Sequence, residues 1–293
     1  MILINNEPEH FIVIKRILLP LDTSPYTDSA MKFAAKIAKH HNAEITGLVI
    51  LDIPGIEKSV SPVPLGAIYY TEQPDQEKKK EAELHIKQLL DKFKKFCSEK
   101  GIRHKEAQLQ GSPSDRILAE SIYYDAVVMG LRTFFHFETS DKPGDSLIKL
   151  LDNSVTPIYA VPQIYDMPSP DEKKLKILLT ISDFLPSARA IQRFVQVATP
   201  DTVEVCLIAE VKDENSAEFN LNQAELYLQS HGFEVLKKEW TDRKLSDHID
   251  EFYIGKVDIL VIGNDVKKGL FSVSVNEVIK NMIKLNRVPL LIG

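Results

Sequence analysis

The chain repeats itself, and this repetition constrains the fold more than any other feature of the sequence. The segment KRILLPLDTSPYTDSA, which begins at Lys15, aligns with LKILLTISDFLPSARA from Leu175 at an offset of 160 residues. Further on, DAVVMG from Asp125 aligns with DILVIG from Asp258 at an offset of 133, and TPIYAVP from Thr156 aligns with VPLLIG at an offset of 132. The sequence therefore predicts two copies of one architecture.

The change in offset locates the boundaries of the two copies. The drop of 160 − 133 = 27 residues means that the first copy is longer, and the extra residues coincide with the Pro-rich segment at 52–75. Between the copies, PQIYDMPSPDEKK at 162–174 has the composition of an exposed linker. We expect one domain at 11–163 and a second at 174–293.

Each copy alternates continuously apolar segments with amphipathic helical patterns. In the first copy, apolar runs near 12–20, 45–51, 105–109, 125–129 and 157–161 predict strands. Between them, Ala30, Phe33, Ala34, Ile37 and Ala38 lie on one face of a predicted helix. Continuously apolar strands joined by helices are typical of a parallel sheet covered on both faces. The pattern predicts a doubly wound α/β fold, twice, with ligands at the carboxyl ends of the strands.

Composition excludes several classes of function. The formal charge is 36 − 42 = −6 and the basic residues are scattered, so nucleic acid is not an expected partner. Cys97 and Cys206 form no metal or disulfide motif, which favours a reduced, cytoplasmic setting. Apolar runs are too short to span a membrane and no export signal is apparent, so no membrane partner is expected either.

Three motifs carry a family resemblance that covers about residues 11–293. They are Asp22 after the first strand with an Ala-rich helix behind it, Gly130 at the end of the fourth strand, and the last strand PIYAVP. Together with the duplication they resemble a tandem universal stress protein. The resemblance implies two flavodoxin-like (adenine nucleotide alpha hydrolase-like) domains, each with a parallel five-stranded sheet of order 3-2-1-4-5. It also implies pairing through the last strands, so PIYAVP and PLLIG are expected to pair with each other.

Family members that bind ATP or AMP imply a loop pattern of Gly, two residues, Gly, nine residues, Gly, then Ser or Thr. Here Gly130 supplies the first glycine and Thr133 occupies the second position. Gly144 comes one residue late, Asp145 takes the hydroxyl position, and Ser146 follows. A carboxylate at a helix N-terminus occupies the place where a phosphate would bind. We therefore expect a degenerate nucleotide site in which Asp145 repels phosphate.

Asp22 has two alternative roles, and both remain open at this point. By resemblance it contacts the adenine or ribose of a nucleotide. Locally, the sequence DTSP predicts a helix start with Ser24 as N-cap and Pro25 at the first helical position. The candidate cofactor-binding residues are Asp22, Thr23, Gly130, Thr133, Gly144 and Ser146. In the second copy Ser182 replaces Asp22, which makes that copy the weaker candidate.

The second copy also lacks the glycine pattern, because Val266 stands at the second position and Gly269 comes early. No nucleophile elbow, Walker lysine or paired-carboxylate site is present, and no catalytic or metal-binding residue is predicted. His40 and His41 are adjacent on a predicted helix, point in different directions and are expected to be solvated.

The sequence thus predicts a non-enzymatic, stress-associated binding or interaction protein with a degenerate nucleotide site and no required cofactor. The alternative is a regulatory switch that binds ATP or AMP through the first domain. The expected assembly is an intramolecular pseudo-dimer of the two domains, with a further homodimer as a possibility left open.

Overall fold

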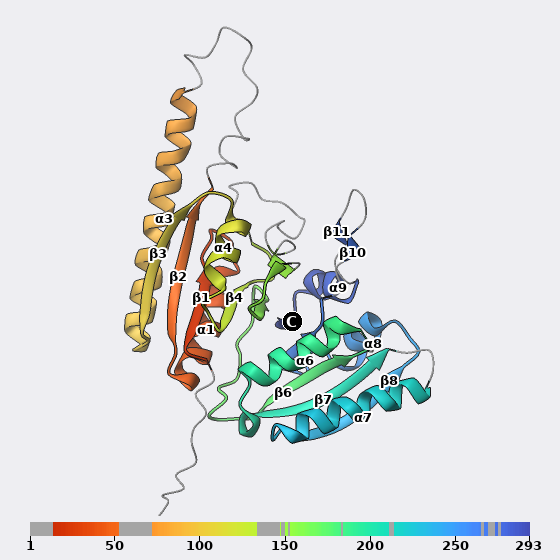
Figure 1. Ribbon diagram of the computed structural model, residues 1–293. Coiled ribbons are helices and arrows are strands. Elements are labelled where there is room, and N and C mark those ends of the chain that lie inside the picture. Colours follow the sequence, from red (N-terminus) through yellow and green to blue (C-terminus); the bar gives the residue numbers. More distant parts are fainter. Residues whose placement is uncertain are drawn as a thin grey trace, which may run out of the picture.

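The computed structural model shows strands alternating with helices through both halves of the chain (Figure 1). It describes residues 14–52, 72–133, 147, 150–151, 153–182, 184–210, 214–264, 267–268, 273–274 and 277–293. Of the predicted Pro-rich insertion, residues 53–71 lie outside this set, and 72–75 belong to a long helix.

The elements of the first half are β1 (Arg16–Pro20), α1 (Thr27–His41), β2 (Glu44–Leu51), α3 (Glu72–Lys100), β3 (His104–Gln110), α4 (Pro113–Ser121), β4 (Ala126–Gly130) and β5 (Ile158–Val161). Those of the second half are β6 (Leu175–Ile181), α6 (Leu185–Val197), the 3-10 helix η2 (Pro200–Thr202), β7 (Val203–Glu210), α7 (Glu214–Ser230), β8 (Val235–Thr241), α8 (Leu245–Phe252), β9 (Ile259–Ile262), β10 (Lys267–Lys268), β11 (Val273–Ser274), α9 (Glu277–Leu285) and β12 (Leu290–Ile292).

Ten of the described strands form one sheet, in the order β3-β2-β1-β4-β5-β12-β9-β6-β7-β8. Within each half all neighbouring strands are parallel. The five strands of the first half follow the order 3-2-1-4-5, and the five of the second half, counted from β6, follow the same order. The remaining strands, β10 and β11, form a separate antiparallel pair.

The two halves are joined through their last strands, so the expected five-stranded sheet of each domain is one half of a single ten-stranded sheet. β12 pairs with β5 in antiparallel register, Leu291 opposite Tyr159, and these are the segments PLLIG and PIYAVP. An uncovered edge strand presents unpaired N–H and C=O groups, and the pairing satisfies both edges at once. The result is a single sheet, parallel within each half and antiparallel at the centre.

Helices cover both faces of the sheet, and each face has its own core. Buried residues of α1, α3, α6 and α7 form one core with the sheet residues that point towards them. Buried residues of α4, α8 and α9, together with Leu147, Leu150 and Leu151, form the other. The central strands β4, β5, β9 and β12 are buried at every position, because helices cover both their faces.

The two Asp residues that begin the repeated DAVVMG and DILVIG segments make equivalent contacts. The Asp125 carboxylate accepts hydrogen bonds from the backbone N–H groups of Lys15 and Arg16, at 2.7 and 2.9 Å. The Asp258 carboxylate accepts one from the N–H of Lys176, at 2.8 Å. Each carboxylate fixes the start of the first strand of its half, so the repetition extends from sequence to hydrogen bonding.

The start of α1 differs from the prediction that Ser24 is the N-cap and Pro25 the first helical residue. The helix begins at Thr27, and Tyr26 precedes it as N-cap without a side-chain hydrogen bond. The Ser24 hydroxyl instead accepts a hydrogen bond from the N–H of Tyr26, at 3.3 Å. The segment before the helix is therefore a hydrogen-bonded turn rather than the first turn of the helix.

The expectation that His40 and His41 are solvated is wrong. His41 is 6% exposed at the end of α1. It lines a cavity of about 50 Å³ together with Phe194 and Leu291 of the second half. His40 forms a hydrogen bond with Asp171 of the linker, with 2.7 Å between Nδ1 and Oδ1. Both rings are held because the linker and the second half pack against this end of α1.

Candidate functional site

The candidate site lies at the sheet edge where β1 and β4 end. The two strands are parallel neighbours, with Leu18 opposite Val127, so their carboxyl ends meet at the same edge. Asp22 comes two residues after β1, and Gly130 is the last residue of β4. The structure therefore brings two of the sequence-predicted motifs to one edge of the sheet.

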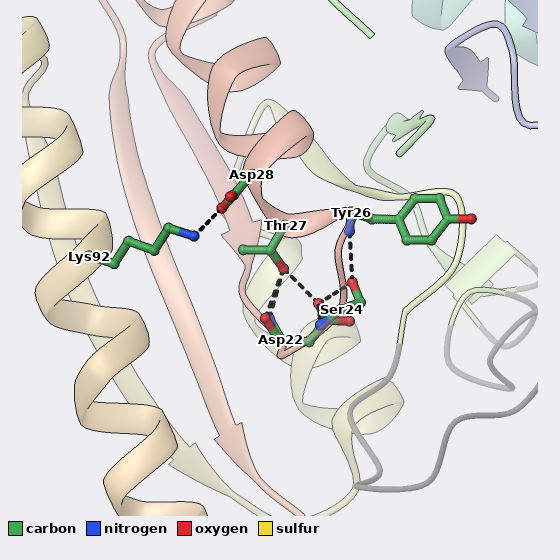
Figure 2. Close-up of polar contacts among 6 residues, drawn as sticks. All are labelled: Asp22, Ser24, Tyr26, Thr27, Asp28 and Lys92. Atoms are coloured by element: carbon green, nitrogen blue, oxygen red, sulfur yellow. Dashed lines mark hydrogen bonds and ion pairs between the residues drawn. The ribbon is translucent and has the colours of Figure 1, made fainter. Parts of the chain in front are cut away.

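Asp22 is the centre of a buried hydrogen-bond network (Figure 2). Its Oδ1 accepts from the hydroxyl of Ser24 at 2.6 Å and from the N–H of Ser24 at 3.1 Å. The same Oδ1 atom lies 2.6 Å from the hydroxyl oxygen of Thr27. That hydroxyl oxygen in turn accepts a hydrogen bond from the backbone N–H of Asp22, at 3.3 Å. Asp22, Ser24 and Thr27 are exposed by 6%, 8% and 5%.

These contacts give Asp22 a local structural role. Hydrogen bonds to an ionised carboxylate are stronger than those between neutral groups, and burial makes the loss of any of them costly. The network ties the end of β1 to the first turn of α1, because Thr27 is the first residue of that helix. Of the two roles left open by the sequence, the local one is the role the described contacts support.

The entrance to α1 is tied to α3 as well. Figure 2 shows Lys92 reaching from α3 towards Asp28 in the first turn of α1, and the two side chains form an ion pair. Both side chains are about half exposed, at 54% and 55%, so the pair contributes on the order of 0.5 kcal/mol or less. Thr23, the other predicted cofactor-binding residue here, is exposed.

One cavity beside Asp22 is small. A cavity of about 30 Å³ is lined by Asp22, Thr23, residues 49–51 of β2 and, on α3, Ala82 and His85 among others. Pockets that hold small organic ligands measure roughly 300–1,000 Å³. A single water molecule needs a cavity of on the order of 10–15 Å³. The cavity between β1, β2 and α3 is the size of water molecules rather than of a purine ring.

Gly130 is a glycine because another residue approaches its backbone. A Cβ atom at this position would lie 2.4 Å from Cβ of Tyr26 and 2.9 Å from the carbonyl oxygen of Arg132. Tyr26 is buried, and burial raises the pKa of its hydroxyl, although nearby Arg132 opposes the shift. Close packing of the segment before α1 against the end of β4 therefore explains a glycine that the sequence analysis assigned to phosphate binding. The contact with Tyr26 was not predicted.

Thr133, at the predicted position of the second glycine, is 5% exposed. Its hydroxyl is buried and has no hydrogen-bond partner among the described residues, and the same holds for Nε of Arg132. The remaining predicted residues, Gly144 and Ser146, lie outside the described residues together with Asp145. The proposed opposition between Asp145 and phosphate therefore stays a prediction.

The second half builds a similar turn with Ser182 at the position of Asp22. The Ser187 hydroxyl, 160 residues after that of Thr27, donates to the carbonyl oxygen of Thr180 at 3.2 Å. It accepts from the N–H of Ser182 at 3.0 Å, just as the Thr27 hydroxyl accepts from the N–H of Asp22. The matched hydroxyls at 27 and 187 were visible in the aligned sequences, but their shared role became clear only from the structure.

The fourth-strand glycine is also matched. A Cβ atom at Gly263 would lie 2.4 Å from the carbonyl carbon of Pro186 and 2.6 Å from the backbone nitrogen of Ser187. Pro186 is the counterpart of Tyr26 at the offset of 160. In both halves, therefore, the start of the first helix packs onto a glycine at the end of the fourth strand or directly after it.

Within the described residues, no group of three or more His, Cys, Asp or Glu side chains is placed to hold a metal ion. In the same part of the chain, none of the helices combines the length and the apolar character that a bilayer crossing demands.

A comparison with protein families finds a match, which lies in the first half of the chain. Residues 14–140 match the model of the Universal stress protein family. The match agrees with the resemblance carried by the motifs of the first half. The match does not extend to the second half. A search of curated proteins found no match to this chain.

Solved structures share the fold over nearly the whole chain. A universal stress protein from Archaeoglobus fulgidus is 18% identical and superposes with a TM-score of 0.61, over 94% of this chain and 97% of its own. A protein of unknown function from Pseudomonas aeruginosa is 14% identical, with a TM-score of 0.55 over 96% of this chain and 92% of its own. At these identities the similarity establishes the fold alone.

One further solved structure is a universal stress protein in complex with cAMP. It is 17% identical, has a TM-score of 0.30, and aligns with 52% of this chain over 98% of its own. At this TM-score the alignment carries no argument about the ligand of this chain.

Proposed function

We propose that this chain is a tandem universal stress protein that acts as a non-enzymatic binding or interaction protein, with a degenerate nucleotide site in its first half. The observation that carries the proposal is the state of Asp22. Its carboxylate oxygen already accepts from Ser24 and Thr27, and the cavity beside it measures about 30 Å³. A residue whose hydrogen bonds hold a turn together is not available to a ligand without cost.

The tandem character rests on contacts that recur at the sequence offsets. The turn hydroxyls at 27 and 187, the carboxylates at 125 and 258 and the glycines at 130 and 263 make equivalent contacts in the two halves. We infer that the second half is a second domain of the same kind and that the halves form an intramolecular pseudo-dimer. The domain bounds remain 11–163 and 174–293, and a further homodimer is open to test by sedimentation.

The proposed setting is the cytoplasm, because both cysteines are unpaired thiols. Nucleic acid is not a proposed partner, given the net charge of −6.

A thermal-shift titration with ATP and AMP, with and without magnesium, tests the proposal. A ligand that binds the folded chain raises its stability by RT ln(1 + [L]/Kd), about 2.7 kcal/mol at a hundredfold excess over Kd. We expect millimolar nucleotide to shift the melting temperature of the parent chain by less than about 1 °C. A dose-dependent rise of several degrees in the parent would overturn the proposal.

The substitution Asp145→Ser provides the matched variant, because it restores the hydroxyl that the loop pattern requires and removes the charge that repels phosphate. If Asp145 is the obstacle, this variant responds to ATP or AMP where the parent does not. Exposed Asp201→Ser removes a carboxylate elsewhere and serves as the control.

One observation favours the second candidate, a switch that binds ATP or AMP through the first half. At the end of β4 the Thr133 hydroxyl and Nε of Arg132 are buried without partners among the described residues. Buried polar atoms usually have partners, so a phosphate is a reasonable occupant at this point. If Thr133→Val abolished a nucleotide-induced shift in the parent chain, this candidate would replace the first.

A further inference from the structure

The second half has a cavity of about 530 Å³ that lies away from the candidate nucleotide site. It is lined near the amino ends of three strands, by Lys176 of β6, Glu204 and Cys206 of β7, and Lys237 of β8. Candidate nucleotide residues lie at the carboxyl ends of strands instead. The volume falls within the range of roughly 300–1,000 Å³ that is typical of small-molecule sites.

One side of the cavity is formed by α8 and the residues that follow it. Phe252 ends this helix, and Tyr253, Lys256 and Val257 continue the lining. Phe252 is 42% exposed and Leu236, across the cavity on the edge strand β8, is 52% exposed. Large apolar side chains that remain partly exposed inside a concave site are available to contact a flat apolar molecule.

Polar side chains that line the cavity are bonded to one another in a cluster. Glu239 accepts from Nε2 of His248 at 3.0 Å and forms an ion pair with Lys237. Lys237 also lies 3.4 Å from the Tyr253 hydroxyl. Burial alone would raise the pKa of Glu239, but hydrogen bonds from Lys237, Tyr253 and His248 lower it overall. The Glu239 carboxylate is thus neutralised by its own neighbours.

The charges that remain favour an anion. Lys237 and Glu239 form an ion pair and cancel each other's charge. The other charged residues of the lining are two lysines, Lys176 and Lys256, and one carboxylate, that of Glu204. Both lysines are exposed, whereas Glu204 is partly buried. In a chain with a net charge of −6, this local excess of positive charge marks the cavity as a place where a small anion is attracted.

The cluster is particular to the second half. β8 and β3 are related by an offset of 132 residues, at which Glu239 corresponds to Ala107. The strand pairing supports this alignment, because Ile208 pairs with Glu239 in the second half just as Leu48 pairs with Ala107 in the first. At the same offset the first half has Arg116, Glu120 and Ser121 in place of His248, Phe252 and Tyr253. The repeated architecture therefore does not require these side chains.

From these observations we propose that the cavity between α8 and strands β6 to β8 is a binding site for a small organic anion with a flat apolar body, such as an aromatic carboxylate or sulfonate. The apolar body packs against Phe252 and Leu236, and the anionic group lies near Lys176 and Lys256. This site is independent of the nucleotide site of the first half.

Fluorescence titration with anilinonaphthalene sulfonate, which has this chemistry, tests the proposal on the full chain. We expect one saturable site with a dissociation constant on the order of 10 µM, as ligand efficiency predicts for a molecule of that size. Lys256→Glu and Phe252→Ser each weaken binding about tenfold or more. Lys80→Glu and Phe219→Ser change an exposed lysine and an exposed phenylalanine outside the cavity and leave binding unchanged.

Alkylation of Cys206 gives a second readout that locates the probe. Cys97 is fully buried, whereas Cys206 is partly exposed in the cavity, so iodoacetamide at alkaline pH modifies Cys206 first. Saturating probe is expected to slow this reaction at least about fivefold, as mass spectrometry of the peptide would show. An unchanged alkylation rate, or equal binding by Lys256→Glu and the parent, overturns the proposal.

Discussion

The turn after β1 and the turn after β6 perform the same task with different chemistry. In the first, the carboxylate of Asp22 draws in Ser24 and Thr27, and the helix begins at Thr27. In the second, Ser182 takes the place of Asp22, and the helix begins two positions earlier in the repeat, at Leu185. In the first half, where the helix starts later, Asp22 makes hydrogen bonds with both Ser24 and Thr27.

The two halves therefore share a hydroxyl, of Thr27 in the first and Ser187 in the second, and a glycine, Gly130 in the first and Gly263 in the second. These residues hold the first helix against the first and fourth strands in both halves. At position 22 the first half has a carboxylate where the second half has Ser182, and this is the place where the family resemblance implies contact with a nucleotide. The described contacts of Asp22 are with the turn itself.

The largest effect is expected from adding a methyl group to the shared glycines. Gly263→Ala forces a Cβ atom to within 2.4 Å of the backbone of Pro186, and Gly130→Ala brings one equally close to Cβ of Tyr26. We expect each to lower the free energy of unfolding by about 3 kcal/mol or more, and Gly263→Ala to cost more because three backbone atoms lie within 2.6 Å of its Cβ position. Urea denaturation measures both.

Gly101→Ala is the control for this pair. Its Cβ would meet nothing within 4 Å, but its φ of +65° disfavours alanine, so a loss of about 1 kcal/mol is expected. If Gly130→Ala and Gly263→Ala were no more harmful than Gly101→Ala, the packing explanation for the matched glycines would be wrong.

A pH effect distinguishes the two halves at the position of His41. His41, at the end of α1, is buried against the second half, whereas its counterpart Asp201 lies in η2, after the end of α6, and is exposed. Burial, and secondarily the neighbouring His40, lowers the pKa of His41 from 6.5 to about 4, with Asp171 opposing and Lys15 adding to the shift. Above pH 6.5 the imidazole is neutral in the folded and unfolded states, so it has no effect on stability there.

Between pH 6.5 and about 4 the unfolded chain binds a proton that the folded chain does not, so stability falls as the pH is lowered. A loss of up to about 3 kcal/mol follows from the size of the shift. His41→Gln should remove this part of the pH dependence in urea denaturation, and the exposed His231→Gln should not. Equal pH profiles for the parent and His41→Gln would contradict the assignment.

The smallest expected effect on stability compares the turn after β1 with the turn after β6. Asp22→Ala removes an acceptor of hydrogen bonds from Ser24 and Thr27, and a loss of about 2 kcal/mol is expected. Ser182→Ala removes a hydroxyl that accepts a long hydrogen bond of 3.4 Å from the N–H of Phe184, so the loss of stability should stay below about 1 kcal/mol. Equal losses in the two variants would mean that the carboxylate adds nothing to the first turn.

The sequence predicted most of the fold because repetition and periodicity are local in the chain. The alternation of apolar strands and amphipathic helices placed the strands, and the aligned Asp125 and Asp258 marked equivalent positions. Features that depend on a distant partner were less accessible. His41 is buried because residues more than a hundred positions away, such as Phe194, cover it, and no pattern around His41 signals this.

The candidate site shows the same limit. Asp22 and Gly130 were selected from the sequence, and the structure brings them to one edge of the sheet. Gly130 suggested a phosphate loop, yet its contact is with Tyr26, which nothing in the spacing of the loop indicates. The sequence identified the positions, whereas their roles depend on side chains that meet only after folding.

The most direct test of the degenerate site is a crystal structure of the full chain grown with millimolar ATP and magnesium. The account predicts no nucleotide density against the loop that follows Gly130, and an Asp22 carboxylate still bonded to Ser24 and Thr27. Density for an adenylate with its phosphoryl groups against residues 130–146 would contradict it.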